Sequence, residues 1–379
     1  MNRTLLKWLC LIFVINLIGI YYVFYYNPSY SIMDIGSESG VHITWNSEGE
    51  KIAFLKNFDG FIKARVYDFQ NKKFKDYPVN SLSEVCFRDN IVFSPDAKKI
   101  VYLTRIGNDR IVSLLNLDSS TVSTLDDILI YSNLSTATTG RPIKTVFWLD
   151  KDRLIYENNI PFKRNGIIIV DLKTGEELLF IKNGLRPSLS NDKTKIAYIV
   201  MAEGGIKFDV KVLDLLSHKT TTLAENVETY LHRIRWSPTD TYIAIGYSQA
   251  YDMGRKADVV EDKIAIIDMD KNFSLISGSK LLASPKWIDE NNIIMAEYKT
   301  SGIVLQSKRI KGLYLYNIET QDYRKISSKI RSLNYYISPD RKTLVSSLGT
   351  RGFFVLNLER LLYPTKIDKL RTKLGIVNP

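Results

Sequence analysis

The stretch that decides the fold is Trp236-Ser-Pro-Thr-Asp-Thr-Tyr-Ile-Ala-Ile245. An aromatic residue ends one apolar segment, a polar turn follows, and a short segment rich in β-branched residues begins. Degraded copies of this pattern start at six other positions, namely Trp45, Phe93, Trp148, Leu189, Trp287 and Ile337. Successive copies are 48, 55, 41, 47, 51 and 50 residues apart. A repeat of this length built from short strands is typical of a β-propeller blade, so the sequence predicts seven blades.

A second marker recurs in phase with the first. Each copy carries Asp or Asn near the end of a later apolar run, at Asp68, Asn116, Asp171, Asp214, Asp268, Asn317 and Asn357. Short side chains with an acceptor oxygen bond nearby backbone N–H groups, so we expect these residues to cap the turn into the next strand. Two markers in the same seven registers predict an all-β, seven-bladed propeller of four-stranded blades over residues 41–364, folded as one closed domain.

The repeats resemble those of the TolB-like, WD-type β-propeller family, whose copies begin with Trp-Ser-Pro-Asp-Gly-Lys-like turns followed by Ile-Ala-Phe-like strands. The turns that match best are Phe93-Ser-Pro-Asp96, Trp236-Ser-Pro238 and Ile337-Ser-Pro-Asp340, and the strands are Lys51-Ile-Ala-Phe54 and Lys195-Ile-Ala-Tyr198. The resemblance covers roughly residues 40–360. Because these motif residues build turns and blade packing, it implies the fold and leaves the activity open.

An apolar segment precedes the repeats. Trp8 to Tyr26 contains 19 residues without a charge, which is long enough to span a bilayer as a helix. Arg3 and Lys7 precede this segment, whereas the first positive charge after it is Lys51, so the positive-inside bias predicts a cytoplasmic N-terminus and an extracytoplasmic propeller. A cleaved signal peptide is the alternative, but the residues before Pro28 make a poor cleavage site. We expect residues 1–28 to be the uncleaved signal anchor of a single-pass cell-membrane protein.

The segments that flank the repeats bear on how the ring closes. Residues 29–40 are either a linker or a ring-closing strand, and Tyr30 to Ile35 could supply the outer strand of the seventh blade. Such a strand would remove an exposed sheet edge. Leu358 to Tyr363 is the alternative source of that strand. In the tail 365–379, Lys or Arg alternates with Ile and Leu, a pattern typical of a short surface helix.

The loops are expected to differ between the two faces of the ring. Adjacent strands of a blade are antiparallel, so first-to-second and third-to-fourth turns share one face, and these are tight. The opposite face receives every long insertion, at residues 118–141, 157–165, 246–263 and 299–311. Loops held on a rigid scaffold are where binding sites usually lie. We therefore expect a partner to dock on this long-loop face.

No catalytic residues can be assigned from the sequence. A Gly-x-Ser-x-Gly nucleophile elbow is absent, and the three histidines, His42, His218 and His232, have no metal-ligand spacing. The acidic residues Asp252, Asp258, Glu261 and Asp262 could hold a hard cation, but their spacing fits no EF-hand loop and favours a solvated loop. The two cysteines define no disulfide framework. We expect no cofactor and no metal ion.

One polar pattern recurs on the predicted innermost strands. Three residues before each first marker the chain carries a polar side chain, at His42, Asn90, Thr145, Arg186, Arg233, Ser284 and Asn334. The following residue is apolar, aromatic or proline in every copy, so alternation directs the polar set to one side of the strands. A hydrated channel wall is one interpretation. The other is a ligand-binding funnel at the mouth of the channel, made basic by the nearby Arg141, Lys144, Arg235 and Arg331 and therefore suited to an anionic group.

The charge balance indicates the same kind of partner. Without Arg3 and Lys7 the chain has 50 basic and 41 acidic residues, a net charge of +9 outside the membrane. A protein or an anionic envelope polymer is the expected partner. Nucleic acid is excluded by the predicted topology and by the lack of a basic helix or a base-stacking module. A non-catalytic binding scaffold in the cell envelope is the first hypothesis for function. The alternative is a propeller enzyme, a lyase or hydrolase acting at the channel mouth, and a stoichiometric transition metal in the purified protein would favour it.

The membrane anchor has a direct test. Full-length protein should remain in the membrane fraction after extraction at alkaline pH, because an apolar helix of this length is held by the bilayer rather than by charge. Protease added to intact cells should digest the propeller, since the predicted orientation places it outside. Release of the intact chain by alkali would contradict the anchor, and protection from protease would contradict the orientation.

Overall fold

The computed structural model describes residues 30–33, 43–58, 61–79, 84–85, 91–106, 109–124, 143–159, 165–203, 205, 207–228, 234–250, 259–276, 281–300, 308–327, 335–347 and 353–363. The predicted signal anchor and the tail from residue 365 onward lie outside these ranges. Among the residues described, no helix has the length and apolar character that crossing a membrane requires.

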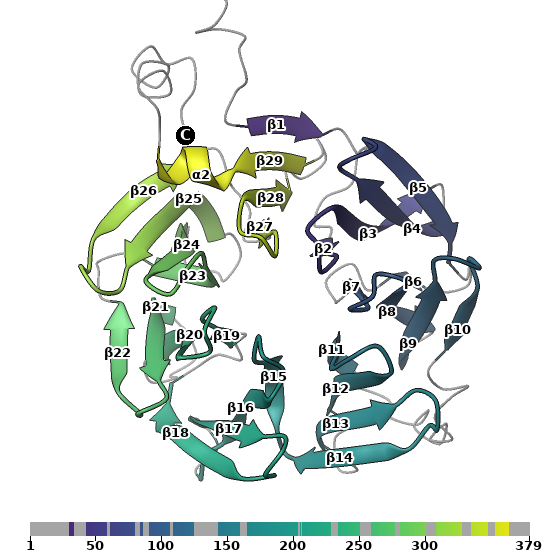
Figure 1. Ribbon diagram of the computed structural model, residues 1–379. Helices are drawn as coiled ribbons and strands as arrows, with labels where there is room; N and C mark the ends of the chain where they lie inside the picture. Colours follow the sequence, from purple (N-terminus) through teal and green to yellow (C-terminus); the bar gives the residue numbers. More distant parts are fainter. Residues whose placement is uncertain are drawn as a thin grey trace, which may run out of the picture.

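The described strands form seven antiparallel sheets arranged around a central opening, as Figure 1 shows. The first three sheets are blade 1 with β2 (Ile43–Trp45), β3 (Lys51–Phe58), β4 (Phe61–Asp68) and β5 (Lys73–Pro78); blade 2 with β6 (Glu84–Val85), β7 (Ile91–Phe93), β8 (Lys99–Ile106), β9 (Asp109–Asn116) and β10 (Val122–Thr124); and blade 3 with β11 (Ile143–Trp148), β12 (Arg153–Asn159), β13 (Asn165–Asp171) and β14 (Glu177–Lys182).

The remaining sheets are blade 4 with β15 (Leu185–Leu189), β16 (Lys195–Met201), β17 (Phe208–Asp214) and β18 (Thr220–Val227); blade 5 with β19 (Arg235–Trp236), β20 (Tyr242–Ala250), β21 (Val259–Asp268) and β22 (Phe273–Ile276); blade 6 with β23 (Leu281–Trp287), β24 (Asn292–Thr300), β25 (Lys308–Asn317) and β26 (Tyr323–Ser327); and blade 7 with β27 (Tyr335–Ile337), β28 (Thr343–Ser347), β29 (Phe353–Asn357) and β1 (Tyr30–Met33). The seven-bladed architecture is confirmed. Blade 2 departs from the predicted four strands, because the short β6 pairs with β8 beside β7.

The outer strand of blade 7 comes from the N-terminal region. Strand β1 pairs antiparallel with β29, from Tyr30 opposite Leu356 to Met33 opposite Phe353. The other candidate segment forms helix α2 (Leu358–Leu362) instead. Figure 1 shows β1 at the outer edge of the blade that also holds the last strands of the chain. The ring is therefore closed by a strand from its start added to strands from its end.

The core is a ring of clusters, one between each pair of neighbouring blades. Each of the seven clusters of buried residues combines side chains of two adjacent sheets. Strand β3 illustrates the division, since Ile52 and Phe54 pack toward blade 7 while Ala53 and Leu55 pack toward blade 2. Both faces of each blade are buried, which explains the continuous apolar runs of these strands.

Tryptophan side chains of the first marker join neighbouring blades by hydrogen bonds. The indole Nε1 of Trp148 donates to the carbonyl of Val92 at 3.2 Å, that of Trp236 to Ser188 at 2.9 Å, and that of Trp287 to Arg235 at 3.0 Å. Each acceptor directly precedes the first marker of the preceding blade. Trp45 occupies the same place in blade 1, but its Nε1 is buried without an acceptor among the described residues. Trp148, Trp236 and Trp287 therefore fill the space between two blades and also link them by a hydrogen bond.

The polar turn after the marker is held by a buried hydroxyl. Four blades carry Ser94, Ser190, Ser237 and Ser338 at this point, and each Oγ accepts a hydrogen bond of 2.9–3.0 Å from the backbone N–H five residues later. In blades 3 and 6 the turn is one residue shorter. Leu149 and Ile288 stand in place of serine there, and the following Asp150 and Asp289 accept the backbone bonds. The Trp-Leu-Asp and Trp-Ile-Asp variants of the motif reflect this shorter turn.

The second marker has the capping role that its position predicts. In six blades its side-chain oxygen accepts backbone N–H groups two to four residues later, as from Lys173 to Asp171 at 2.7 Å. The other five are Asp68, Asn116, Asp214, Asp268 and Asn317. These caps fix the turn from the third strand to the fourth.

The Trp236 hydrogen bond should be measurable by substitution. Trp236→Phe removes the indole donor and leaves the Ser188 carbonyl without it, whereas Trp45→Phe removes a donor that has no described acceptor. We expect Trp236→Phe to lower the free energy of unfolding by about 1–2 kcal/mol more than Trp45→Phe, as measured by urea denaturation. Equal losses for the two variants would show that the inter-blade bond contributes no stability.

Turn carboxylates should make the stability depend on acid pH. Desolvation acts to raise the pKa of Asp192, but hydrogen bonds from Ser190 and Thr194 outweigh it and lower the pKa to about 2. Because this pKa lies below its ordinary value of 3.8, the carboxylate stabilises the fold at pH values above 3.8. That stabilisation is lost as the pH falls toward 2. The free energy of unfolding of Asp192→Ala, measured by urea denaturation, should therefore be lower than that of the parent by a constant amount from pH 7 to about pH 4. Below that pH the difference between the two proteins should become smaller. A difference that stays constant down to pH 2 would contradict the lowered pKa of Asp192.

Candidate functional site

Three of the seven predicted channel residues lie in the described part of the chain: Thr145, Arg186 and Ser284. The other four, His42, Asn90, Arg233 and Asn334, lie outside it. Of the basic residues expected nearby, the Arg235 side chain is described, whereas Arg141, Arg331 and the side chain of Lys144 are not.

The innermost strands are irregular at the predicted positions. The register of pairing shifts between Ile143 and Thr145, between Leu185 and Ser188, and between Ala283 and Lys286. Arg186 and Ser284 lie inside these bulges with φ of 53° and 56°, the left-handed region that side chains rarely adopt. A bulge redirects the side chain that strict alternation would place, so Arg186 and Ser284 share one backbone geometry and Thr145, which pairs with Glu157, has another.

Thr145, Arg186 and Ser284 accordingly have different surroundings. Thr145 is 8% exposed, and its hydroxyl donates to Oε2 of Glu157 at 3.3 Å. The carbonyl of Ser284 accepts a hydrogen bond from the hydroxyl of Tyr335. Arg186 is half-buried, and its side chain lines a cavity described below. Of the three, only Arg186 presents a charge to that cavity.

Glu157 joins blades 3 and 4 beneath this site. Its carboxylate is 1% exposed, and Oε2 accepts both the Thr145 hydroxyl and the backbone N–H of Arg186, the latter at 3.1 Å. The bond to Arg186 crosses from β12 to β15. It therefore holds the bulge, and with it the backbone that carries the Arg186 side chain.

A second set of residues on the innermost strands supplies part of the cavity lining, and most of it was not predicted from the sequence. The residue directly before each first marker is half-buried in all seven blades: Thr44, Val92, Phe147, Ser188, Arg235, Lys286 and Tyr336. The residue before that is buried in all seven, at Ile43, Ile91, Val146, Pro187, Ile234, Pro285 and Tyr335. The period-2 pattern was the available signal, since alternation puts this set on the same side as the predicted one. Of this set, only Arg235 was picked out from the sequence.

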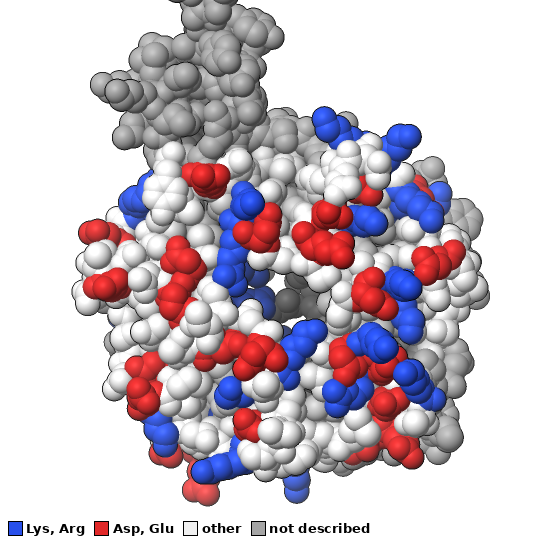
Figure 2. Space-filling view, viewed as in Figure 1, with Lys and Arg blue, Asp and Glu red and all other residues white. Residues whose placement is uncertain are grey.

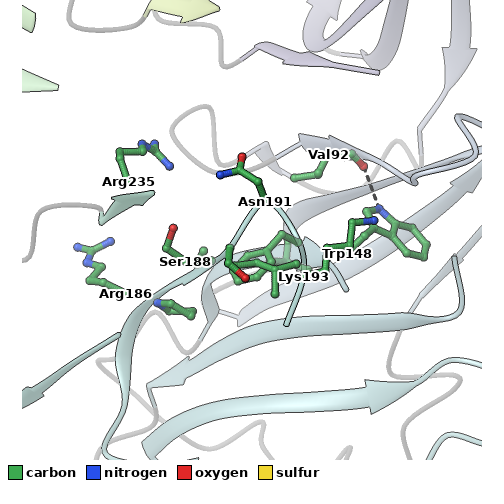
Figure 3. A pocket seen from close by; sticks show the side chains of 13 residues that line it. Val92, Trp148, Arg186, Ser188, Asn191, Lys193 and Arg235 are labelled. Atoms are coloured by element: carbon green, nitrogen blue, oxygen red, sulfur yellow. Dashed lines mark hydrogen bonds between the residues drawn. The ribbon is translucent and has the colours of Figure 1, made fainter. Parts of the chain in front are cut away.

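Members of both sets meet in one cavity of about 430 Å³ in the channel wall between blades 2 and 5. Its lining includes Val92, Phe147, Ser188 and Arg235 from the second set and Thr145 and Arg186 from the first. In Figure 3 the side chains of Arg186 and Arg235 lie on the same side of the cavity, with Ser188 and Asn191 between them and Trp148. The cavity extends along the whole of β15, from Arg186 at the long-loop end to Asn191 and Lys193 in the tight turn.

The cavity is cationic. Arg186, Lys193 and Arg235 are among the thirteen described residues that line it, and none of these thirteen is Asp or Glu. Figure 2 shows both basic and acidic side chains around the central opening on the visible face, so the positive charge is a property of the cavity lining rather than of the rim. The arrangement suits an anion, because three positive charges act without a described carboxylate in the lining.

Of the other candidates from the sequence, the structure describes the side chain of His218 alone. His218 lies in the turn between β17 and β18, exposed and with φ of 55°, while His42 and His232 are outside the described residues. The side chains of Asp252, Asp258, Glu261 and Asp262 are also outside the description. Among described residues, no three His, Cys, Asp or Glu side chains are grouped as a metal site would need.

The chain is similar in structure to several known propellers. Oligogalacturonate lyase in complex with manganese is 12% identical with a TM-score of 0.55, over 86% of this chain and 96% of that one. The β-propeller domain of the Trilobed protease from Pyrococcus furiosus, which has an open velcro topology, is 12% identical with a TM-score of 0.56, over 85% and 94%. TolB from Acinetobacter baumannii is 15% identical with a TM-score of 0.45, over 80% and 78%.

At these identities the similarities show the fold alone, and they include enzymes as well as TolB. No protein-family model matches the chain, and no curated protein does. The chain is thus a seven-bladed β-propeller with distant structural similarity to TolB, oligogalacturonate lyase and peptidase propellers.

Proposed function

We propose that this protein is a membrane-anchored, extracytoplasmic scaffold of the cell envelope that binds a partner without catalysing a reaction. The observation that carries the proposal is the channel cavity, whose described lining contains Arg186, Lys193 and Arg235 and no acidic residue. The partner, a protein or an anionic envelope polymer, places a negatively charged group in this cavity.

The construction of the cavity supports binding of an anion. Arg186 and Arg235 lie on the innermost strands of two neighbouring blades, and the indole of Trp236 bonds β15 to β19. The backbone positions of the two arginines are thus fixed relative to each other before an anion binds, so little backbone entropy is lost on binding. The channel walls also lower the local dielectric constant, which strengthens each charge-assisted hydrogen bond relative to the exposed surface.

The location of the protein rests on its sequence. The uncharged segment from Trp8 to Tyr26 supports a single transmembrane anchor, and the basic residues before it support a cytoplasmic N-terminus. The propeller then faces the envelope with a net charge of +9. That balance favours association with anionic partners at the membrane surface. We propose that the partner approaches from the long-loop face, the end of β15 at which Arg186 lies.

Crosslinking of intact cells tests the scaffold. Formaldehyde crosslinking, purification of the full-length protein and mass spectrometry should recover a defined set of partners. The double variant Arg186→Gly/Arg235→Met should reduce that recovery at least tenfold, because each lost charge-assisted contact costs roughly 1.5–3 kcal/mol. Glycine is chosen at residue 186 because its φ of 53° suits glycine, so the guanidinium is removed without straining the bulge.

Lys182→Ala/Lys219→Ala is the matched control. It also removes two positive charges, from exposed side chains that do not line the cavity. Partner recovery should be unchanged in this variant. If the double arginine variant recovers the same amount of crosslinked partners as the parent protein, the proposal of a scaffold that binds its partner through this cavity is contradicted. A fall of many degrees in the thermal midpoint of that variant would show that the two arginines stabilise the ring instead.

A further inference from the structure

The two cavity arginines come from different strands. Arg186 belongs to β15 and Arg235 to β19, and Figure 3 shows their side chains on the same side of the cavity. Ser188 lies nearby in the lining with its hydroxyl group, and Lys193 adds a third positive charge at the tight turn. The donors therefore approach from several directions and from separate backbone segments.

Arg186 adds a second, independent observation. The Nε of its guanidinium is buried and has no hydrogen-bond acceptor among the described residues. Its backbone is held in the left-handed conformation by Glu157, at 3.1 Å, so the side chain starts from a fixed point. A buried donor without an acceptor is unfavourable, and an incoming oxygen atom would relieve that penalty.

The geometry discriminates between kinds of anion. A planar carboxylate has two oxygens in one plane and is satisfied by the fork of a single arginine. A phosphoryl group has three terminal oxygens in a tetrahedral arrangement and carries a charge near −2, so it can accept from two arginines and a hydroxyl at once. The cavity of about 430 Å³ is of the size that holds small organic ligands, and Phe147 and Val92 give it an apolar wall.

We propose that the cavity binds a phosphate monoester, with its phosphoryl group between Arg186 and Arg235 and its apolar or aromatic body against Phe147 and Val92. This inference rests on the proposed function, since it names the anionic group that the scaffold receives. The phosphoryl group takes the hydrogen bond of Arg186 Nε, and Ser188 donates to a further oxygen.

Calorimetric titration of the full-length protein in detergent tests the ligand class, with phenyl phosphate as the probe. Benzoate serves as the planar carboxylate of similar size, inorganic phosphate as the anion without a body, and benzyl alcohol as the neutral comparator. We expect one phenyl phosphate per chain, bound at least tenfold more tightly than benzoate or inorganic phosphate, and no detectable binding of benzyl alcohol. Equal affinity for phenyl phosphate and benzoate would overturn the phosphoryl assignment. Equal affinity for phenyl phosphate and inorganic phosphate would overturn the proposed contact of the ligand body with the apolar wall.

Two arginine variants and a backbone control locate the binding site. Arg186→Gly and Arg235→Met should each weaken phenyl phosphate binding at least tenfold. Asn183→Gly makes the same kind of backbone change at an exposed residue before β15, where φ is 58°, and removes no charge and no residue of the described lining. Its affinity should equal that of the parent protein. Unchanged affinity in either arginine variant, or an equal loss in Asn183→Gly, would overturn the site.

The result separates this inference from the proposed function. If phenyl phosphate fails to bind while partner crosslinking still depends on Arg186 and Arg235, the scaffold stands and the phosphoryl ligand is wrong. If phenyl phosphate binds through the arginines while crosslinking is indifferent to them, the cavity is a phosphoryl site and the scaffold proposal fails.

Discussion

Each blade of this protein buries both of its faces against its neighbours, and the rest of the structure depends on that constraint. In β3, successive residues enter different clusters, with Ile52 and Phe54 facing blade 7 and Ala53 facing blade 2. A sheet with two apolar faces has no stable surface to expose to water. Seven such sheets are satisfied together only when the ring is complete. The indole bonds of Trp148, Trp236 and Trp287 add polar links across the same interfaces.

The candidate site inherits its rigidity from this packing. Arg186 and Arg235 come from different blades, so their relative position is set by the interface between blades 4 and 5 rather than by a local turn. The position of Arg186 also depends on blade 3, because its backbone N–H donates a hydrogen bond to the buried Glu157 of that blade. A binding site built in this way exists only in the assembled ring, and no isolated blade contains it.

The sequence predicted the fold well because both markers report local turn chemistry that repeats in every blade. Ser94 and Asp171, for example, accept hydrogen bonds from backbone N–H groups a few residues away. Such local bonds can be predicted from the sequence of a single repeat. The channel wall was harder to predict. Bulges at Arg186 and Ser284 break the alternation that placed them, and Arg186 acquires its fixed position from Glu157, a residue 29 positions earlier in the chain. Ser188 was not predicted as a lining residue, although the alternation of the strand places it on the same side as Arg186. A long-range contact of this kind leaves no periodic trace.

Strands β1 and β29 are neighbours in the folded ring but are far apart in the order of synthesis. Tyr30 pairs with Leu356, so β1 leaves the ribosome before the other strands of the ring, and its partner β29 leaves after them. Throughout synthesis the first blades can pack on one another, but β1 has no strand to pair with until residues 353–357 have been made. Ring closure is therefore the most non-local step of folding, and its rate is limited by the cost of bringing such distant segments together. Until then, β1 presents an unpaired edge that could pair with another chain.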